Sequence, residues 1–151
     1  MKKNIALILP ALFLGACATS NNSIPEDWVD ITADREQRAE YWTPTVRPEP
    51  TYPVNAAMAG RSGCVDMSFF ITPDGEAVGV EVLHAFPGNT FIQSAKNALS
   101  LWRWVPTDTN AERQAVKTTV QLDFMVEGGS NFEAAKAACE KEGSSIFAAM
   151  K

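Results

Sequence analysis

The chain of 151 residues contains one histidine and shows none of the common catalytic motifs. It lacks a glycine-rich phosphate loop, a paired-histidine metal motif and a serine-nucleophile elbow. A lone histidine such as His84 is more typical of a structural or surface residue than of a catalyst. With Cys64 and Cys139 it would give three zinc ligands, but these lack the local spacing of zinc sites. We therefore expect neither an enzyme nor a cofactor nor a bound metal.

The sequence also has little positive charge. It holds 13 basic and 18 acidic residues, and the first sixteen residues contain two of the basic ones and none of the acidic ones. Without those sixteen residues the net charge is −7. Such a balance argues against binding to nucleic acid and against electrostatic docking on anionic lipid.

The apolar run near the N-terminus, residues 5–15, is too short to span a membrane as a helix, which needs about 20 residues. It follows two lysines, as in a signal peptide over residues 1–16. The run ends in Leu14-Gly15-Ala16-Cys17, which resembles a bacterial lipobox. Cleavage would leave Cys17 as the lipid-modified first residue. Ala18 then stands at the second position, where it resembles the residue found in outer-membrane lipoproteins. An ordinary secretory signal and a short buried helix are the alternatives.

Residues 17–49 are predicted to form a tether. Small polar residues come first, and a short helix is expected within residues 32–42. The chain is then held extended by a proline-rich spacer that contains Pro44, Pro48, Pro50 and Pro53.

Residues 50–126 carry the patterns of a small α+β domain. The hairpin signal Thr72-Pro73-Asp74-Gly75 separates two strands, and Gly75 suits the left-handed position of the turn. A helix is predicted from Asn89 or Thr90 to Trp102, and a third strand follows over residues 116–126. In the first strand Val65, Met67, Phe69 and Ile71 point to one face, and Cys64, Asp66, Ser68 and Phe70 point to the other.

Residues 127–151 are predicted to form a last helix and a tail. Ser130 and Glu133 match a capping box, and Cys139 shares the inner face of the helix with Phe132 and Ala135. Because a signal peptide implies an oxidising compartment, we expect Cys64 and Cys139 to form a disulfide. Closing a loop of this length would stabilise the fold by roughly 4 kcal/mol in the chain-entropy model.

An ordered set of short motifs now points to one family. The set consists of Tyr52-Pro53, Ala56, Gly60, Gly63-Cys64-Val65, Phe69-Phe70-Ile71, Asp74-Gly75, Phe91, Ala95, Ala98 and Trp102-Arg103-Trp104-Val105-Pro106. It resembles the C-terminal domain of TonB proteins, although the family usually has phenylalanine where Trp104 stands. The resemblance implies a three-stranded antiparallel sheet in the order 2-1-3 with helices packed on it. A right-handed crossover would instead place the third strand beside the second.

In the order 2-1-3 the third strand is a sheet edge, where a foreign extended segment could add. The resemblance implies that this segment belongs to an outer-membrane transporter. It assigns partner binding to Tyr52, Pro53, Gln114, Val116, Thr118, Val120, Leu122 and Phe124. An edge protected by the last helix is the alternative reading of this strand.

The expected function is therefore a TonB-like protein-interaction module in TonB-dependent transport. We expect it on the periplasmic side of a Gram-negative cell envelope, with a lipid anchor in the outer membrane. A structural envelope lipoprotein that binds another envelope protein, or forms a homodimer, is the alternative function.

Overall fold

A computed structural model describes residues 23–140 of the chain. Cys17 with its lipobox and the tail from Ser144 onward lie outside these residues. Within residues 23–140, no helix has both the length and the apolar character needed to cross a membrane. The elements in chain order are β1 (Trp28–Asp30), α1 (Arg38–Tyr41), β2 (Trp42–Val46), α2 (Val54–Met58), β3 (Gly63–Ile71), β4 (Ala77–Phe86), α3 (Ile92–Ser100), β5 (Arg103–Pro106), η1 (Asp108–Asn110), β6 (Ala115–Phe124) and α4 (Phe132–Cys139).

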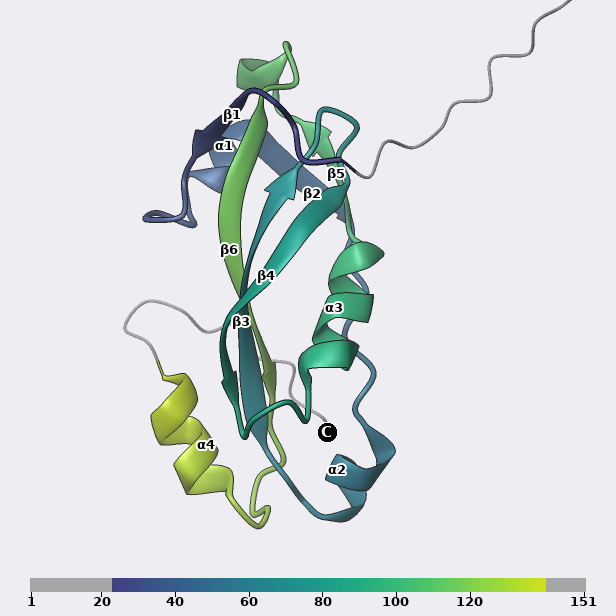
Figure 1. The fold of residues 1–151 in the computed structure, drawn as a ribbon, viewed down its shortest axis with the longest axis vertical. Helices are drawn as coiled ribbons and strands as arrows, with labels where there is room; N and C mark the ends of the chain where they lie inside the picture. The colour runs from purple at the N-terminus through teal and green to yellow at the C-terminus, as the bar shows by residue number, and fades with distance from the viewer. Residues whose placement is uncertain (1–22, 141–151) are drawn as a thin grey trace, which may run out of the picture.

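The centre of the fold is a four-stranded sheet in the order β1-β6-β3-β4 (Figure 1). β3 pairs antiparallel with β4 on one side and with β6 on the other. These three strands confirm the predicted order 2-1-3. The hairpin between β3 and β4 is also confirmed, because Gly75 takes the left-handed φ of +77° that the turn requires.

The sheet is larger than predicted, because segments that we expected to be tether and spacer join it. β1 adds to the outer side of β6 in parallel orientation. β2, which contains Pro44, pairs antiparallel with β5 to form a separate two-stranded sheet. β1 has only three residues, which is too few to show an alternation of apolar and polar side chains. β2 contains proline, which argues against a strand, so neither element was predicted from the sequence.

The sheet has one apolar face, which is covered by α3. The alternating residues of β3 and β6 on this face pack against Leu99 of α3 and against the ring of Phe91. Trp42 and Ile31, from the segment expected to be a tether, are also buried in this core. The domain core therefore extends beyond residues 50–126.

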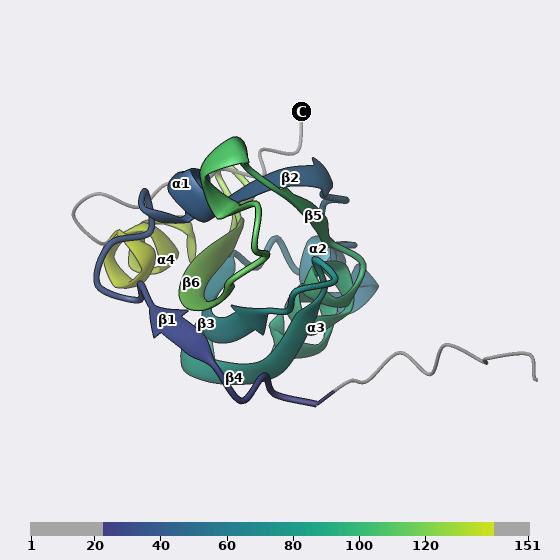
Figure 2. The ribbon, with the colours of Figure 1, turned by 90° about the horizontal axis from the view of Figure 1, so that it is seen from above.

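The other face of the sheet is covered near one end by α4. Figures 1 and 2 place α3 and α4 on opposite sides of the sheet. The predicted bond between Cys64 of β3 and Cys139 of α4 is present, with the two Cα atoms 5.9 Å apart. α4 is thus joined covalently to the central strand.

Candidate partner-binding edge

The outer side of β6 is the edge that the sequence assigned to partner binding. The backbone N–H of Ile31 donates to the carbonyl oxygen of Lys117 over 2.9 Å, so this carbonyl points away from β3. Along an antiparallel strand, alternate residues point their backbone groups to the same side. The N–H and C=O groups of Thr119, Gln121 and Asp123 therefore also point outward from the β3–β6 ladder.

Part of this edge is already occupied by the chain itself. Trp28, Val29 and Asp30 of β1 lie opposite Ala115, Val116 and Lys117 of β6. The prediction that the third strand is a free edge is therefore wrong for its first three residues. The remaining stretch, residues 118–124, lies between α1 and β1 at one end of the strand and α4 at the other (Figure 1). Its residues are buried, with at most 7% of their surface exposed, but no described strand pairs with its outer side. We call this stretch the open edge in that sense.

The predicted binding side chains of β6 do not lie on the open edge. They belong to the core under α3 and are buried, namely Val116, Thr118, Val120, Leu122 and Phe124. Because the carbonyl of Lys117 points outward, the alternate residues from Val116 to Phe124 direct their backbone N–H and C=O groups toward β3. Side chains at these positions cannot touch a partner. The intervening residues Thr119, Gln121 and Asp123 are also buried, so a partner strand reaches their backbone only by displacing what covers it.

Tyr52, Pro53 and Gln114 occupy structural positions near the two ends of β6. Tyr52 packs edge-on against Phe124, with ring centroids 5.7 Å apart, and its hydroxyl donates to the carbonyl of Arg61. Pro53 is the residue before α2. The carbonyl of Gln114 accepts a hydrogen bond of 3.0 Å from the indole N–H of Trp42.

Three arginines that the sequence did not single out lie in the segment before residue 48. Nη1 of Arg38 lies 3.4 Å from the carbonyl oxygen of Thr119. Arg35 forms an ion pair of 3.7 Å with Asp66, on the face covered by α4. The guanidinium of Arg47 stacks on the ring of Trp102 at 4.5 Å. Burial, and then the charges of Arg47 and Arg35, lower the pKa of Arg38.

A second polar cluster lies next to the disulfide. The side-chain amide of Gln121 donates to a carboxylate oxygen of Asp123 over 2.8 Å and to the carbonyl of Cys139 over 2.7 Å. Within residues 23–140, Cys64, Asp123 and Cys139 form a group whose ligand atoms lie within 4.8 Å of one another. The two sulfur atoms are bonded to each other, so they are not thiolates and do not ligate a metal in this state. His84 lies on β4 opposite Asp66 and is not part of this group.

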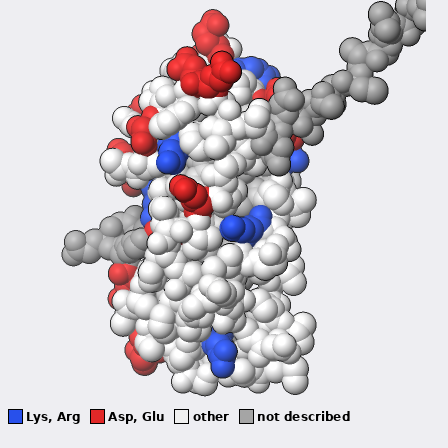
Figure 3. Space-filling view, in the orientation of Figure 1, with Lys and Arg blue, Asp and Glu red and all other residues white. Residues whose placement is uncertain are grey.

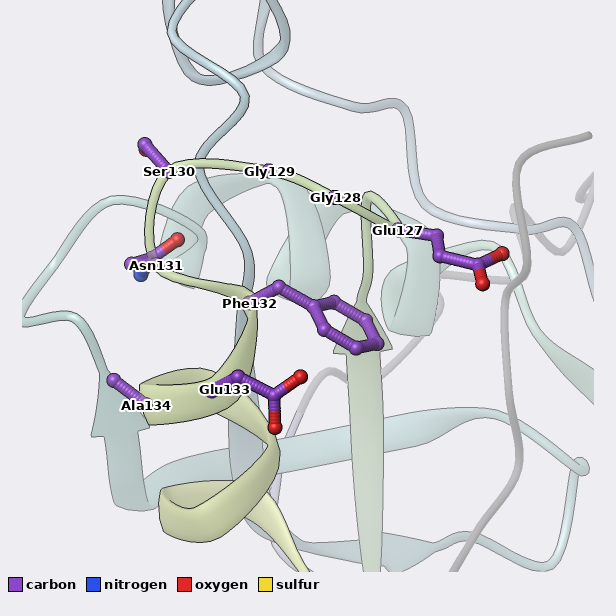
Figure 4. A pocket seen from close by; sticks show the side chains of 8 residues that line it. All are labelled: Glu127, Gly128, Gly129, Ser130, Asn131, Phe132, Glu133 and Ala134. Carbon is purple, nitrogen blue, oxygen red and sulfur yellow. The ribbon is translucent and has the colours of Figure 1, made fainter.

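A pocket of about 550 Å³ lies at the start of α4 (Figure 4). It is lined by eight consecutive residues, from Glu127 to Ala134. Asn131 uses its side chain to bond both the N–H and the C=O of Ser62. The lining comes from one continuous stretch of chain, and the side-chain amide of Asn131 is already hydrogen-bonded to Ser62. We therefore interpret the pocket as a hollow beside the turn and not as a binding site.

The remaining visible surface offers no charged platform. On the face seen in Figure 3, the area over β4 and α3 carries few charged side chains. Acidic groups gather at the end of the molecule where η1 lies. The candidate for partner binding is therefore the open edge of β6, in a small α+β domain.

Comparison with known proteins identifies the family to which the chain belongs. Residues 48–126 match the model of the Gram-negative bacterial TonB protein C-terminal, so the chain belongs to the TonB C-terminal family. This family is not enzymatic, and its domains act in the periplasm of Gram-negative bacteria. Arg35, Arg38 and Arg47 precede the matched residues.

Individual relatives agree with this membership. The chain is 40% identical to protein TonB of Escherichia coli over 60 residues, which is 40% of this chain and 25% of that protein. It is 25% identical to protein TonB of Klebsiella pneumoniae over 114 residues, covering 72% of this chain and 45% of that protein. The chain thus spans less than half the length of these curated relatives.

A solved structure shares the fold. The solution NMR structure of the Pseudomonas aeruginosa TonB C-terminal domain aligns with a TM-score of 0.54 at 26% identity. The alignment covers 65% of this chain and 93% of that one. Almost the whole of that domain therefore has a counterpart here, and this chain adds elements to it.

Proposed function

We propose that this protein is a periplasmic interaction module that binds extended segments of outer-membrane transporters by adding them to the edge of β6. Membership in the TonB C-terminal family supports a role in TonB-dependent transport. The observation that carries the proposal is the outward direction of the backbone groups of Thr119, Gln121 and Asp123. These groups form one side of a β ladder, and an extended peptide supplies the other side.

The position of β1 limits how a partner can bind. A segment that pairs with residues 119–123 has to displace the groups that bury them, among them the side chain of Arg38. A longer segment has to displace β1 from Ala115, Val116 and Lys117. Trp28 and Val29 are each 36% exposed, so most of their surface is covered and is uncovered when β1 leaves.

The membrane attachment is a separate part of the proposal. The lipobox ending at Cys17 supports a lipid anchor in the outer membrane, facing the periplasm. With such an anchor the module is not coupled directly to an inner-membrane motor. Mass spectrometry of the mature protein tests this, because a diacylated or triacylated cysteine at the new N-terminus is expected. An N-terminus that retains Met1 contradicts it.

Strand addition is tested by titrating the isotope-labelled protein with peptides from candidate transporters. We expect amide chemical-shift changes at residues 118–124 and none on β4, the opposite end of the sheet. Thr119→Pro should weaken binding at least tenfold, because proline removes an N–H that points to the partner and not to β3. Thr119→Val is the matched control, since it keeps this N–H.

Two outcomes contradict the proposal. The first is the absence of shift changes along residues 118–124 with every peptide. The second is a stable homodimer that pairs through the same edge, which sedimentation and crosslinking would detect. A homodimer would favour a structural envelope lipoprotein instead.

A further inference from the structure

Three potential metal ligands meet beside α4, although they are far apart in the sequence. Cys64 is on β3, Asp123 is on β6 and Cys139 is the last residue of α4. The two sulfur atoms and a carboxylate oxygen all lie within 4.8 Å of one another. The three residues are buried, with at most 3% of their surface exposed. The fold therefore gathers two cysteines and a carboxylate on the sheet face that α4 covers.

This set of donor atoms suits zinc once the disulfide is reduced. Zn²⁺ binds cysteine thiolates and carboxylate oxygens, usually with four ligands arranged as a tetrahedron. With Zn–S distances of about 2.3 Å, the two sulfur atoms of such a site lie about 4 Å apart. The Cα atoms of Cys64 and Cys139 are 5.9 Å apart, so rotation of the two side chains is enough to reach this separation.

The side chain of Gln121 holds two of the three residues in position. Its amide nitrogen donates to a carboxylate oxygen of Asp123 over 2.8 Å and to the carbonyl of Cys139 over 2.7 Å. In metal sites, hydrogen bonds of this kind orient the ligands. The Oε1 atom of Gln121 is buried and has no hydrogen-bond partner among residues 23–140. A water molecule bound to the metal would find an acceptor in this oxygen.

The carboxyl group of Asp123 lies in an environment that disfavours its charge. Burial raises the pKa of Asp123; Asp66 also raises it, whereas Gln121 and Arg35 act in the opposite direction. A dication next to a buried carboxyl group favours the ionised form. Metal binding would therefore compensate a carboxylate that the fold keeps away from water.

We propose that Cys64, Cys139 and Asp123 bind Zn²⁺ when the two cysteines are reduced, with water as the fourth ligand. A dithiol reductant gives two electrons and two protons to the disulfide and is itself oxidised to a disulfide. Zn²⁺ then replaces the two thiol protons, which pass to solvent. The metal joins β3, β6 and α4 in place of the disulfide, so α4 stays on the sheet in the reduced protein.

Cobalt spectroscopy of the reduced protein tests the site. Cys17 is alkylated first, while Cys64 and Cys139 are protected by their bond, so reduction frees only these two thiols. A phosphine, which is oxidised to the phosphine oxide, then reduces the disulfide, and Co²⁺ is added in the absence of oxygen. We expect thiolate-to-cobalt charge-transfer absorption and the visible bands of tetrahedral Co²⁺, at a single metal ion per chain. Zn²⁺ should remove these bands, and the oxidised protein should not show them.

Variants identify the ligands. Asp123→Asn should weaken Co²⁺ binding by about tenfold or more, and Gln121→Leu should weaken it by about tenfold because the ligand carboxylate loses its hydrogen bond. Glu81→Gln is the matched control, since it removes a carboxylate of β4 that is not part of the group. His84→Ala removes the single histidine of the chain. Both of these variants should bind Co²⁺ as the unchanged sequence does.

Hydrogen exchange tests whether the metal holds α4. In the reduced protein with a chelator, the amides of α4 should exchange faster than in the oxidised protein. Addition of Zn²⁺ should slow their exchange again, and Asp123→Asn should reduce this protection. If Zn²⁺ leaves the exchange of α4 unchanged, the metal does not take the place of the disulfide and the proposal is wrong.

Three spectroscopic results also overturn the site. The first is the absence of charge-transfer absorption in the reduced protein. The second is binding that Asp123→Asn leaves unchanged or that His84→Ala abolishes, because the ligands are then different. The third is one metal ion for two chains, which places the metal between copies. None of these results depends on whether a partner strand adds to β6.

Discussion

The two faces of the central sheet are buried to a similar extent along β3, but they are built from different side chains. On the face under α3, Val65, Met67 and Phe69 are fully buried among aromatic and aliphatic neighbours. On the opposite face Asp66 and Ser68 are nearly as buried, and α4 is fixed to this face by the disulfide. The comparison shows that a buried sheet face does not have to be apolar when a covalent bond holds its cover in place.

The largest expected effect comes from a truncation on the apolar face. Phe69 is fully buried and stacks on Trp104, with ring centroids 5.6 Å apart. Phe69→Ala should lower the free energy of unfolding by about 4 kcal/mol, because it removes apolar contacts and leaves a cavity. Urea denaturation followed by tryptophan fluorescence measures this change.

The adjacent residue is the matched control for the other face. Ser68 is also buried, but its hydroxyl has only a long contact of 3.5 Å with the carboxylate of Glu81. Ser68→Ala should therefore change the free energy of unfolding by less than about 1 kcal/mol. Equal losses in the two variants would show that the faces contribute alike.

The assignment of residues to these faces could be predicted from the sequence, but the cover of the polar face could not. The period of two in β3 placed Val65 and Asp66 on opposite sides correctly. Since Asp66 and Ser68 are polar, their face reads as solvated. Its burial depends on α4, on the bond at Cys139 and on Arg35, which lie far from β3 in the sequence.

The candidate site shows a similar division. The sequence assigned partner binding to the third strand, and the order of β3, β4 and β6 confirms the place of this strand in the sheet. The assignment named side chains that are buried in the core, because side-chain alternation does not indicate where the backbone groups point. β1 and the arginines near β6 were missed because short strands and scattered charges leave no periodic signal.

Removal of the disulfide should have the next largest effect. The bond closes a loop with a sequence separation of 75 residues. The double variant Cys64→Ala, Cys139→Ala should lose about 2–4 kcal/mol in the free energy of unfolding. Because the apolar core is untouched, we expect near-native amide shifts in β3 and β6 on the α3 face and new mobility in α4.

Hydrogen exchange of the double variant can contradict this expectation. Amides of α4 should exchange much faster than those of β6. If exchange accelerates equally in the two elements, the disulfide stabilises the whole domain and not the cover of the polar face. Reduction of the native protein should reproduce the behaviour of the double variant.

A carboxyl group on the polar face should make stability depend on pH. Burial raises the pKa of Asp123; Asp66 also raises it, whereas Gln121 and Arg35 act in the opposite direction. The folded protein then holds this proton more tightly than the unfolded chain does. The contribution of Asp123 to the free energy of unfolding is therefore most favourable below the pKa of the unfolded chain, near 3.8. This contribution is lost as the pH rises through the higher pKa of the folded protein.

Asp123→Asn tests this contribution. Asparagine keeps an oxygen that accepts the hydrogen bond from Gln121 but does not ionise. We expect a higher urea midpoint than wild type at pH 7 and a difference that shrinks toward pH 4. Asp27→Asn, at an exposed position, should show no such trend. A variant that is less stable than wild type at pH 7 would contradict the predicted sign.

A small effect on stability is expected at β1, the strand at one edge of the four-stranded sheet. Trp28 packs edge-on against Phe70 with ring centroids 5.2 Å apart, and the ammonium group of Lys117 lies 5.5 Å from the Phe70 ring. Trp28→Ala should lower the free energy of unfolding by only about 1 kcal/mol, because Trp28 is 36% exposed. It should nevertheless loosen β1, so that the amide of Ile31, which donates to Lys117, exchanges faster. Val29→Ala is the matched control, since Val29 is equally exposed at 36% and carries no aromatic ring. If the two variants accelerate hydrogen exchange at the amide of Ile31 equally, the pair of Trp28 and Phe70 does not hold β1 on the sheet.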